Sequence, residues 1–187
     1  AGRKILRVWR RAKNVLIDIE GEQTILVHMK MTGHLLYGNY SYNQRAEWKW
    51  SSKEKYLSDP FNRFVHFVIE LQNGKHIAFS DMRKFATVKL IPDRIALTSE
   101  FAQTGPEPLD PKFDWQELRR ALMQKPNGKI KTVLMDVAIV AGIGNIYSDE
   151  ILWYCKIHPE RTVSSLSDSD FKKILRLTKQ LLSKGID

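Results

Sequence analysis

The segment GPEPLDPKF, Gly105–Phe113, separates two parts of the sequence that differ in hydrophobic periodicity. Before it, short runs rich in β-branched and aromatic residues alternate with turn signals, which is typical of antiparallel strands. After it, apolar residues recur every three or four positions, as in amphipathic helices. Three prolines and a glycine within the segment favour an irregular connection. The sequence therefore predicts an α+β fold with two domains, residues 1–104 and residues 105–187.

The first domain is expected to form an antiparallel β-sandwich. Its predicted strands are ILRVW (5–9), VLIDIE (15–20), TILVHMKM (24–31), RFVHFVIEL (63–71), HIAFS (76–80) and TVKLI (87–91). Hairpin turns are predicted at Glu20–Gln23 and at Gln72–Lys75, where the Asn-Gly pair suits a type I′ turn. Tyr40–Pro60 mixes aromatic and charged residues without clean alternation, which indicates a surface excursion or an irregular hairpin to which we assign no chemistry.

The second domain is expected to be helical. Helical periodicity covers WQELRRALM (115–123), IKTVLMDVAIVA (130–141), NIYSDEILWYC (145–155) and SDFKKILRLTKQLL (169–182). One helix is predicted to end at Ala141 or Gly142, and Asn145 to cap the next one, whose first N–H groups suit a phosphate oxygen. The alternative is that Gly142 and Gly144 only end a helix and that Asn145 is only a cap.

The glycines of this turn do not fit the two common nucleotide motifs. A dinucleotide fingerprint needs its glycines directly after a strand, and the phosphate loop of an NTPase ends in Gly-Lys-Ser/Thr. Here a helix precedes the glycines, and the loop ends in Gly-Asn-Ile. A dinucleotide fingerprint and an NTPase phosphate loop are therefore excluded for this turn.

Composition favours a polyanionic partner. The 187 residues include 30 Lys and Arg against 21 Asp and Glu, a net charge of +9, which suits nucleic acid or an anionic membrane surface. Cys155 is the only cysteine, which excludes an intrachain disulfide and a Cys-rich zinc site built from this chain alone. The sequence has no apolar run of about 18 residues and no secretory signal pattern. We therefore expect an intracellular, soluble protein of the cytoplasm or nucleoid.

Five motifs identify a resemblance when they are taken in their order along the chain. They are RRAKNVLIDIEG (10–21), ILVHMKMTGHL (25–35), FSDMRKFA (79–86), GPEPLD (105–110) and GIGNIYSDEIL (142–152). From about Ile5 to Gly185 the chain resembles the formamidopyrimidine-DNA glycosylase and endonuclease VIII family, more closely the formamidopyrimidine branch. In that family the glycine turn belongs to a helix-two-turns-helix element that grips the DNA backbone beside the lesion. The resemblance implies that Asn145 contacts DNA phosphate.

The resemblance also implies a set of void-filling residues. A glycosylase turns a damaged nucleotide out of the duplex, and apolar or aromatic wedges with a neighbouring cation can occupy the vacated space. The family's HxxM and RxF motifs fall on Met31, Arg83 and Phe85. Arg83 would donate hydrogen bonds to the orphaned base, for which cytosine is suited, while Phe85 wedges into the step and Met31 occupies the gap. The alternative makes Met31 and Phe85 core residues and Arg83 a surface cation.

Four further residues are candidates for contact with the DNA backbone. Lys13 matches a family lysine that contacts the phosphate near the lesion and takes part in β-elimination; otherwise it lies on a solvated or phosphate-facing strand edge. His28 matches a second phosphate contact, although a lone histidine near a strand end is often structural. Lys131 matches a family lysine, and Lys129 is chosen for its charge alone.

Two positions depart from the family pattern. Phe64 stands where the family usually has a DNA-contacting histidine, and Pro126 lies near the position of another DNA-contacting lysine. DNA contacts at these two positions are therefore not expected.

The resemblance implies an intact enzyme that removes oxidised purines, such as 8-oxoguanine and formamidopyrimidines, from double-stranded DNA. The enzyme would then cleave the strand by β- and δ-elimination. It would act as a monomer on DNA that contains an oxidised base or an abasic site. Family members begin with Pro-Glu, whose secondary amine attacks the sugar C1′, and end with a ribbon holding one zinc ion. This chain begins at Ala1, downstream of the position of that Pro-Glu pair, and stops at KGID, before the position of the zinc ribbon. We expect no metal and no glycosylase activity in this chain alone.

Three alternatives remain open from the sequence. The first is an endonuclease VIII-like glycosylase for oxidised pyrimidines. The second is a non-catalytic core that binds damaged DNA. The third is a basic ribosome-associated protein, because some of those also contain a helix-two-turns-helix element.

Overall fold

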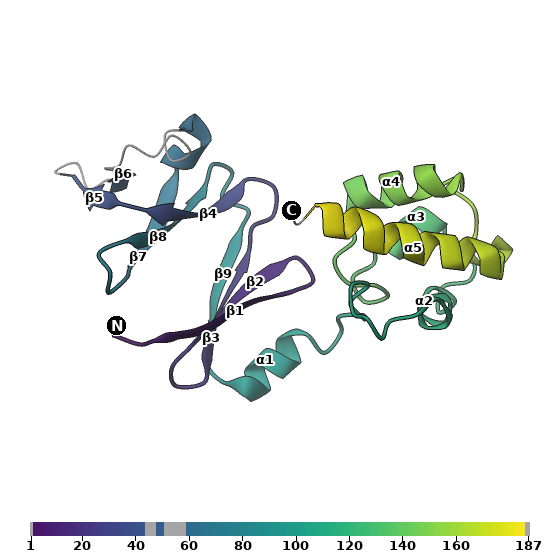
Figure 1. Ribbon diagram of the computed structural model, residues 1–187, viewed down its shortest axis with the longest axis horizontal. Coiled ribbons are helices and arrows are strands. Elements are labelled where there is room, and N and C mark those ends of the chain that lie inside the picture. Colours follow the sequence, from purple (N-terminus) through teal and green to yellow (C-terminus); the bar gives the residue numbers. More distant parts are fainter. Residues whose placement is uncertain (1, 44–47, 51–58, 186–187) are drawn as a thin grey trace. The chain divides into compact units, whose positions relative to one another are not determined.

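The computed structural model describes residues 2–43, 48–50 and 59–185 (Figure 1). These residues form two compact units. The first comprises the described residues up to Val8 and from Asn14 to Ile91, and the second comprises Trp9–Lys13 and the described residues from Pro92 onward. The first unit is built from strands and the second mainly from helices, so the predicted α+β class is confirmed. The expectations for Ala1, for the end of KGID and for much of Tyr40–Pro60 lie outside the described residues.

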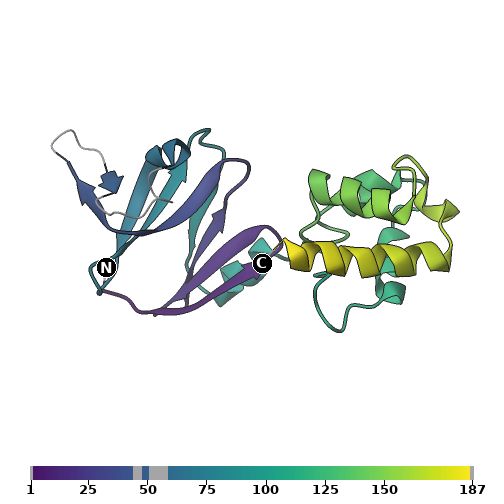
Figure 2. The ribbon, with the colours of Figure 1, turned by 45° about the horizontal axis from the view of Figure 1, so that its top comes forward.

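In its described part, the first unit contains three sheets (Figures 1 and 2), with strand orders β1-β2-β3-β9, β4-β8-β7 and β5-β6. The strands are β1 (Ile5–Arg11), β2 (Asn14–Ile19), β3 (Gln23–His28), β4 (Gly33–Gly38), β5 (Tyr40–Tyr42), β6 (Trp48–Trp50), β7 (Val65–Glu70), β8 (His76–Asp81) and β9 (Thr87–Ile91). A short 3₁₀ helix, η2 (Pro60–Arg63), precedes β7. The sequence did not predict β4, because GHLLYG has glycine at both ends and no clean alternation.

Both faces of the β1-β2-β3-β9 sheet are covered where β2 and β3 pair. Leu16 and Ile17 are consecutive, so their side chains point to opposite faces, and both are buried. Asp18, next along β2, is also buried, and its carboxylate accepts a hydrogen bond of 2.7 Å from the hydroxyl of Thr24, its partner across the strand pair. This bond compensates part of the cost of burying the polar group.

The two predicted hairpin turns are present, but one has a different conformation. Gly21 and Glu22 both have positive φ between β2 and β3. In the turn between β7 and β8, Gly74 has a φ of 74° and Asn73 does not have positive φ. The predicted type I′ turn is therefore wrong, because that turn requires positive φ at both central residues. The Asn73 side chain instead accepts a hydrogen bond from the N–H of Lys75.

The helices of the second unit are α1 (Arg94–Glu100), α2 (Trp115–Leu122), α3 (Ile130–Leu134), α4 (Asn145–Cys155) and α5 (Asp168–Lys184), with a 3₁₀ turn, η3 (Val163–Ser165), before α5. Helix α5 begins with a capping box formed by Ser167 and Asp170. The predictions of α2, α4 and α5 are confirmed. No helix in the described part of the chain has the length and apolar character needed to cross a membrane.

The helix predicted over residues 130–141 is wrong beyond Leu134. The Asp136 carboxylate accepts a hydrogen bond from the N–H of Ala138, and the Asp136 carbonyl accepts one from the N–H of Ile139. Aspartate readily forms such local bonds, which compete with continued helix. The chain therefore makes a turn after α3 and a second turn at Gly142–Gly144 before α4 begins.

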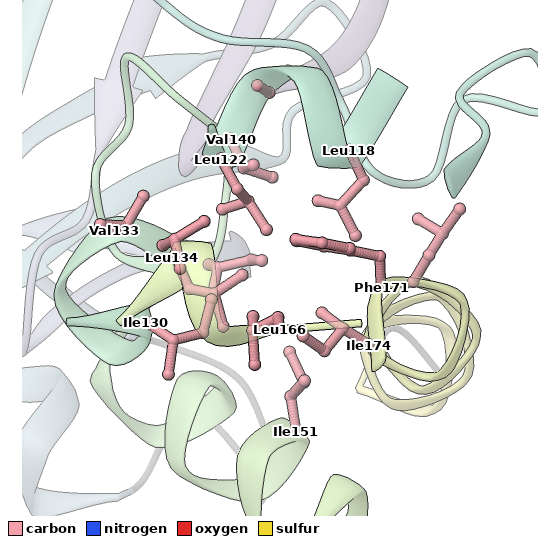
Figure 3. Packing of buried hydrophobic residues seen from close by; sticks show 14 of the residues in the cluster. Leu118, Leu122, Ile130, Val133, Leu134, Val140, Ile151, Leu166, Phe171 and Ile174 are labelled. Carbon is pink, nitrogen blue, oxygen red and sulfur yellow. The ribbon is translucent and has the colours of Figure 1, made fainter. Parts of the chain in front are cut away.

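One apolar core holds the second unit together (Figure 3). Side chains from α2, α3, α4 and α5 converge on it, and those drawn and labelled are Leu118, Leu122, Ile130, Val133, Leu134, Val140, Ile151, Leu166, Phe171 and Ile174. In the second turn, Ile143 is 2% exposed and belongs to this core. The turn before α4 is thus anchored by a buried side chain between its two glycines.

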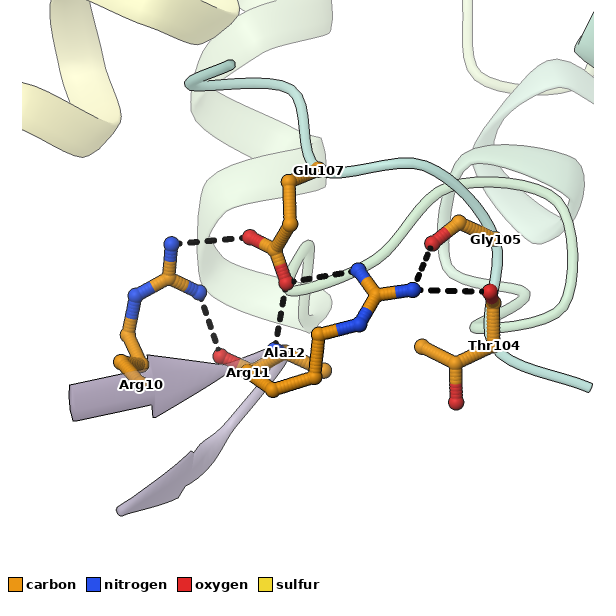
Figure 4. Close-up of polar contacts among 6 residues, drawn as sticks. All are labelled: Arg10, Arg11, Ala12, Thr104, Gly105 and Glu107. Carbon is orange, nitrogen blue, oxygen red and sulfur yellow. Dashed lines mark hydrogen bonds and ion pairs between the residues drawn. The ribbon is translucent and has the colours of Figure 1, made fainter. Parts of the chain in front are cut away.

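A half-buried carboxylate, Glu107, holds the end of β1 within the second unit (Figure 4). It accepts hydrogen bonds from Arg10 at 2.8 Å, from Arg11 at 3.0 Å and from the N–H of Ala12 at 2.6 Å. Burial opposes ionisation of Glu107, but the bonds from Ala12, Arg10 and Arg11 outweigh it and lower the pKa of its carboxyl. Arg11 also donates to the carbonyls of Thr104 and Gly105, each at 2.9 Å. The carboxylate therefore fixes the turn at Ala12, which has a φ of 52°.

We expect Glu107→Gln to lower the free energy of unfolding by about 2 kcal/mol at pH 7, because it weakens hydrogen bonds to a charged group and leaves two arginines beside a neutral amide. The pKa of Glu107 is lowered by folding, so this stabilisation is complete above about pH 4.5, the ordinary value, and is lost as the pH falls through the lowered value. Urea unfolding at pH 7 and pH 3 measures both effects. The control, Glu150→Gln, changes an exposed carboxylate of the same unit. Equal stability of the two variants at pH 7 would contradict the expectation.

Candidate nucleic-acid interface

The turn between β1 and β2 brings Lys13 against the glycine turn before α4. A Cβ built on Gly144 would lie 2.5 Å from the Lys13 ammonium nitrogen, so the ammonium occupies the space that a side chain would need. A Cβ on Gly142 would lie 3.8 Å from the Arg10 guanidinium and 3.9 Å from the Ala12 carbonyl oxygen. Gly142 also has a φ of 85°, a conformation that favours glycine. The first glycine is thus needed for its backbone conformation and the second for close approach.

The amino-terminal end of α4 is the positive end of its dipole. Gly144 is the N-cap, with extended backbone, and no side chain caps the first N–H groups. The prediction that Asn145 is the N-cap is therefore wrong, because Asn145 already has helical conformation as the first residue of α4. The Lys13 ammonium and the first turn of α4 together form a small region of positive potential, which is suited to an anion.

Lys129 and Lys131 both form ion pairs with acidic residues of the second unit. The Lys131 ammonium lies 2.7 Å from a carboxylate oxygen of Asp149, in α4. Lys129 pairs with Glu160, which lies after α4, and both side chains are well exposed. Lys131 is thereby attached to the helix that begins at Asn145, whereas Lys129 contacts the segment that follows the helix.

A cleft of about 180 Å³ adjoins this region within the second unit. The residues that line it come from the end of β1 and the turn after it, the Gly105–Phe113 segment, the glycine turn, α4, and α5 with its C-cap: Arg10, Ala12, Glu107, Pro108, Leu109, Ala141, Gly142, Tyr147, Leu182 and Gly185. A larger cleft of about 1010 Å³ runs along α4 toward Pro159. Neither cleft is lined by a predicted site residue, but the smaller one includes Ala12 and Gly142, which are close in sequence to Lys13 and Asn145. We therefore take the surroundings of the smaller cleft as the candidate site.

The first unit contains a second group of predicted residues on two neighbouring connections. Gly33, which begins β4, pairs with Asp81, which ends β8. His28, which ends β3, pairs with Thr87, which begins β9. The β3–β4 and β8–β9 connections therefore both run between the same two sheets, and their ends are paired with each other in each sheet. The predicted void-filling residues lie on these two connections.

Arg83 contacts both Met31 and Phe85. The Arg83 guanidinium lies 3.3 Å from the Met31 sulfur and 4.6 Å from the centre of the Phe85 ring, a cation–π distance. Met31 is 73% exposed and Phe85 is 55% exposed. The alternative that these two are core residues is therefore wrong. We call Met31, Arg83 and Phe85 the exposed trio.

The remaining sequence candidates occupy simple structural positions. The His28 ring nitrogen Nδ1 accepts a hydrogen bond of 3.1 Å from the N–H of Lys30, which fixes the ring at the end of β3. Phe64 packs under the Arg63 guanidinium, 4.9 Å from the ring centre, and its carbonyl accepts from the N–H of Asp81. The Pro126 carbonyl accepts from the N–H of Ser164.

The described residues do not fit a zinc site. Within residues 2–43, 48–50 and 59–185, no three His, Cys, Asp or Glu side chains are grouped to hold a metal ion. Cys155 is buried in the helical core, and burial raises the pKa of its thiol to about 11, whereas zinc binds the thiolate.

Three structural residues of these sites were not selected from the sequence. Glu107 organises the β1–β2 turn, and Asp81 and Thr32 lie beneath the exposed trio. Each lies within a quoted motif, and Asp81 closely precedes the basic residues Arg83 and Lys84, which was an available signal. Glu107 offered no such signal, because its arginine partners lie far away in the sequence.

We expect Gly142→Ala to lower the free energy of unfolding by about 1–2 kcal/mol, because alanine is strained at a φ of 85°. Gly144→Ala should cost less than about 1 kcal/mol, since its backbone is extended and the new Cβ meets only the end of the flexible Lys13 side chain. Urea unfolding of both variants measures the difference. A larger loss for Gly144→Ala than for Gly142→Ala would contradict this account of the turn.

Comparisons with known proteins agree on one family. Residues 1–88 match the formamidopyrimidine-DNA glycosylase N-terminal domain, and residues 104–187 match the formamidopyrimidine-DNA glycosylase H2TH domain, the helix-two-turns-helix. The chain is 35% identical over 187 residues to a formamidopyrimidine-DNA glycosylase of Herpetosiphon aurantiacus and 32% identical over 187 residues to that of Heliobacterium modesticaldum. It spans 62% of the length of each of these relatives.

Solved structures agree with the sequence comparisons. The fold matches Lactococcus lactis formamidopyrimidine-DNA glycosylase bound non-covalently to DNA with an abasic site, with a TM-score of 0.80 and 28% identity, over the whole of this chain and 65% of that one. The same enzyme in complex with DNA containing Fapy-dG matches with a TM-score of 0.80 and 29% identity, over the whole of this chain and 63% of that one. With both domains matched in order and the helix-two-turns-helix in place, the chain belongs to the formamidopyrimidine-DNA glycosylase family.

Proposed function

We propose that the protein containing this chain is a bifunctional DNA glycosylase and AP lyase, which removes oxidised purines from duplex DNA and cleaves the strand by β- and δ-elimination. The single observation that carries the proposal is the exposed trio, because an arginine, a methionine and a phenylalanine held together in solvent have no packing role. Its relatives act on formamidopyrimidine lesions by name, and the structural neighbours hold DNA with an abasic site or Fapy-dG.

The proposed DNA-backbone contact is made by Lys13, Asn145 and the first N–H groups of α4. The ammonium against Gly144 and the uncapped helix end support this, since both favour a phosphate oxygen at the same place. Lys13 would also act in β-elimination. Lys131, attached to α4 through Asp149, and His28 are proposed as further phosphate contacts. Lys129 is the weakest candidate, because it is chosen for its charge alone and pairs with Glu160, outside α4.

The exposed trio is proposed to fill the space left when the damaged nucleotide leaves the stack. Phe85 would insert its ring into the base step, and Met31 would occupy the gap. Arg83 would donate hydrogen bonds to the orphaned base. Because its guanidinium carries only donors, it favours a base with acceptors on the exposed edge, such as cytosine with O2 and N3.

The nucleophile and the zinc ion implied by the family are not assigned to the described residues. Base excision with Schiff-base chemistry needs an amine to attack the sugar C1′, and the Lys13 ammonium is proposed for elimination and phosphate binding. A zinc ion would need ligands other than the described side chains. We propose that the full-length protein acts as a monomer on chromosomal DNA.

The full-length protein should be incubated with a duplex containing 8-oxoguanine opposite cytosine and with a matched duplex containing thymine glycol, in parallel reactions without and with borohydride. Faster strand cleavage at 8-oxoguanine is expected without borohydride, and a trapped covalent adduct is expected with it. Preference for thymine glycol would favour an endonuclease VIII-like enzyme. Binding to abasic DNA without cleavage or adduct would indicate a non-catalytic core, and preferential binding to RNA would refute the proposal.

We expect Lys13→Gln to weaken binding to abasic and undamaged duplexes alike and to reduce the slope of log K against log salt by about one, because one phosphate contact is lost. Gly144→Ala should weaken binding in the same direction, because its Cβ displaces the ammonium. Fluorescence anisotropy between 50 and 200 mM salt measures both, a range over which phosphate contacts respond strongly. The control is Lys173→Gln, which removes a charge at the other end of α4, where Lys173 donates to the Cys155 carbonyl. An unchanged slope for Lys13→Gln would remove Lys13 from the backbone contact.

We expect Arg83→Ala to reduce the preference for cytosine opposite an abasic site, because the donor to the orphaned base is lost. The loss should correspond to about 1–3 kcal/mol of discrimination, which is typical of an arginine that reads a base edge. Competition binding with the four possible opposite bases measures it. Lys30→Ala, in the neighbouring connection, is the matched charge control. An unchanged order of preference in Arg83→Ala would contradict the assigned role.

A further inference from the structure

Asp81 is a buried carboxylate at the end of β8, directly before the segment that carries Arg83 and Phe85. The residue is 1% exposed. One carboxylate oxygen accepts from the Thr32 hydroxyl and, at 3.2 Å, from the N–H of Arg83, and the other accepts from the N–H of Ala86 at 2.9 Å. Each of these donors lies in one of the two connections that hold the exposed trio. The carboxylate is therefore satisfied by connection residues and not by core residues.

These bonds join the two connections at the points next to the exposed trio. Thr32 follows Met31 directly, and its hydroxyl oxygen also lies 3.3 Å from the N–H of Arg83. The main chain of Asp81 is itself fixed, since its N–H donates to the Phe64 carbonyl and its carbonyl lies 2.7 Å from Nε2 of His66. Asp81 is thus a rigid point to which the Met31 side and the Arg83 side are both attached.

Both connections contain a residue in the left-handed conformation, which non-glycine residues rarely adopt. Lys30 has a φ of 53° and Lys84 has a φ of 56°. Such conformations are unfavourable and persist where surrounding bonds hold them. The Met29–Gly33 turn is closed by a 3.0 Å bond from the N–H of Gly33 to the Met29 carbonyl, and a Cβ on Gly33 would lie 2.5 Å from that oxygen. The two turns are therefore held in one shape.

The Arg83 guanidinium contacts Met31 and Phe85, and no ion pair between it and the Asp81 carboxylate occurs in the described structure. Thr32 and main-chain N–H groups take up the carboxylate oxygens. Arginine beside a carboxylate commonly forms a paired fork. The observed arrangement leaves the guanidinium on the exposed side, with the two apolar side chains.

We propose that Asp81 and Thr32 are positioning residues, which hold Met31, Arg83 and Phe85 as one preformed unit that inserts into DNA where a nucleotide has been displaced. The inference rests on the proposed function of the trio and deepens it. Without these two residues the trio would have to be ordered during binding, and the ordering cost would reduce affinity for DNA with a gap in the stack. Affinity for an intact duplex would be little changed, because phosphate contacts provide it.

The test uses Asp81→Asn, Thr32→Val and Thr32→Ser in the full-length protein. The probe is a duplex with a tetrahydrofuran abasic analogue opposite cytosine and 2-aminopurine beside it, compared with the same duplex without the analogue. We expect Asp81→Asn to reduce the ratio of abasic to intact affinity by about tenfold, and Thr32→Val by about threefold, because a hydrogen bond is worth about 1 kcal/mol. The rise in 2-aminopurine fluorescence on saturation should also fall. Thr32→Ser keeps the hydroxyl, so its affinity ratio and its fluorescence rise should both stay at the wild-type level.

Two further variants separate this inference from the function on which it rests. Arg83→Ala and Phe85→Ala should also lower the affinity ratio. If they do not, the proposed function of the trio is wrong. If they do, while Thr32→Val keeps the wild-type ratio and fluorescence, the inference is overturned. If Asp81→Asn unfolds, the comparison of Thr32→Val with Thr32→Ser decides, because the valine fills the same space without the hydroxyl.

Discussion

The carboxylate of Glu107 allows a dense group of cations to lie beside the positive end of a helix. Arg10, Arg11 and Lys13 are close in sequence, and the Lys13 ammonium reaches the first turn of α4 at Gly144. Like charges at this spacing repel one another and are repelled by the helix dipole. Glu107 accepts from both arginines and from the turn itself, which leaves Lys13 as the cation at the helix end. The proposed phosphate site therefore depends on an acid that is not itself proposed to bind phosphate.

The same principle recurs in the first unit. Asp81 is surrounded by the basic sequence of its connection, and it uses its oxygens to fix main chain and the Thr32 hydroxyl. As a result, Met31 and Phe85 are exposed with Arg83 already in contact with both. In each unit one carboxylate organises a turn that carries a basic residue proposed to contact DNA. The free energy of the protein–DNA contacts is then not reduced by the cost of ordering these side chains during binding.

The sequence predicted much of the fold but less of the local geometry. Runs of β-branched and aromatic residues identified most strands, and helical periodicity identified α2, α4 and α5, because both patterns follow from which side chains the fold buries. They failed where a local polar bond overrides periodicity, as at Asp136, whose bonds end the helix after Leu134. The site candidates came from family motifs, and their exposure and mutual contact could not be read from them. The reason for a glycine at position 144 could not be predicted from the sequence either, because it depends on where the Lys13 side chain lies.

The most direct test of the central claim is a crystal structure of the protein bound to a duplex with a tetrahydrofuran abasic analogue opposite cytosine. We predict the Lys13 ammonium and the first N–H groups of α4 on one phosphate beside the lesion. In the same complex, Arg83 should donate to the orphaned cytosine while Phe85 lies in the base step. A complex in which the exposed trio remains in solvent, or in which the Lys13 ammonium contacts no phosphate, would contradict the account.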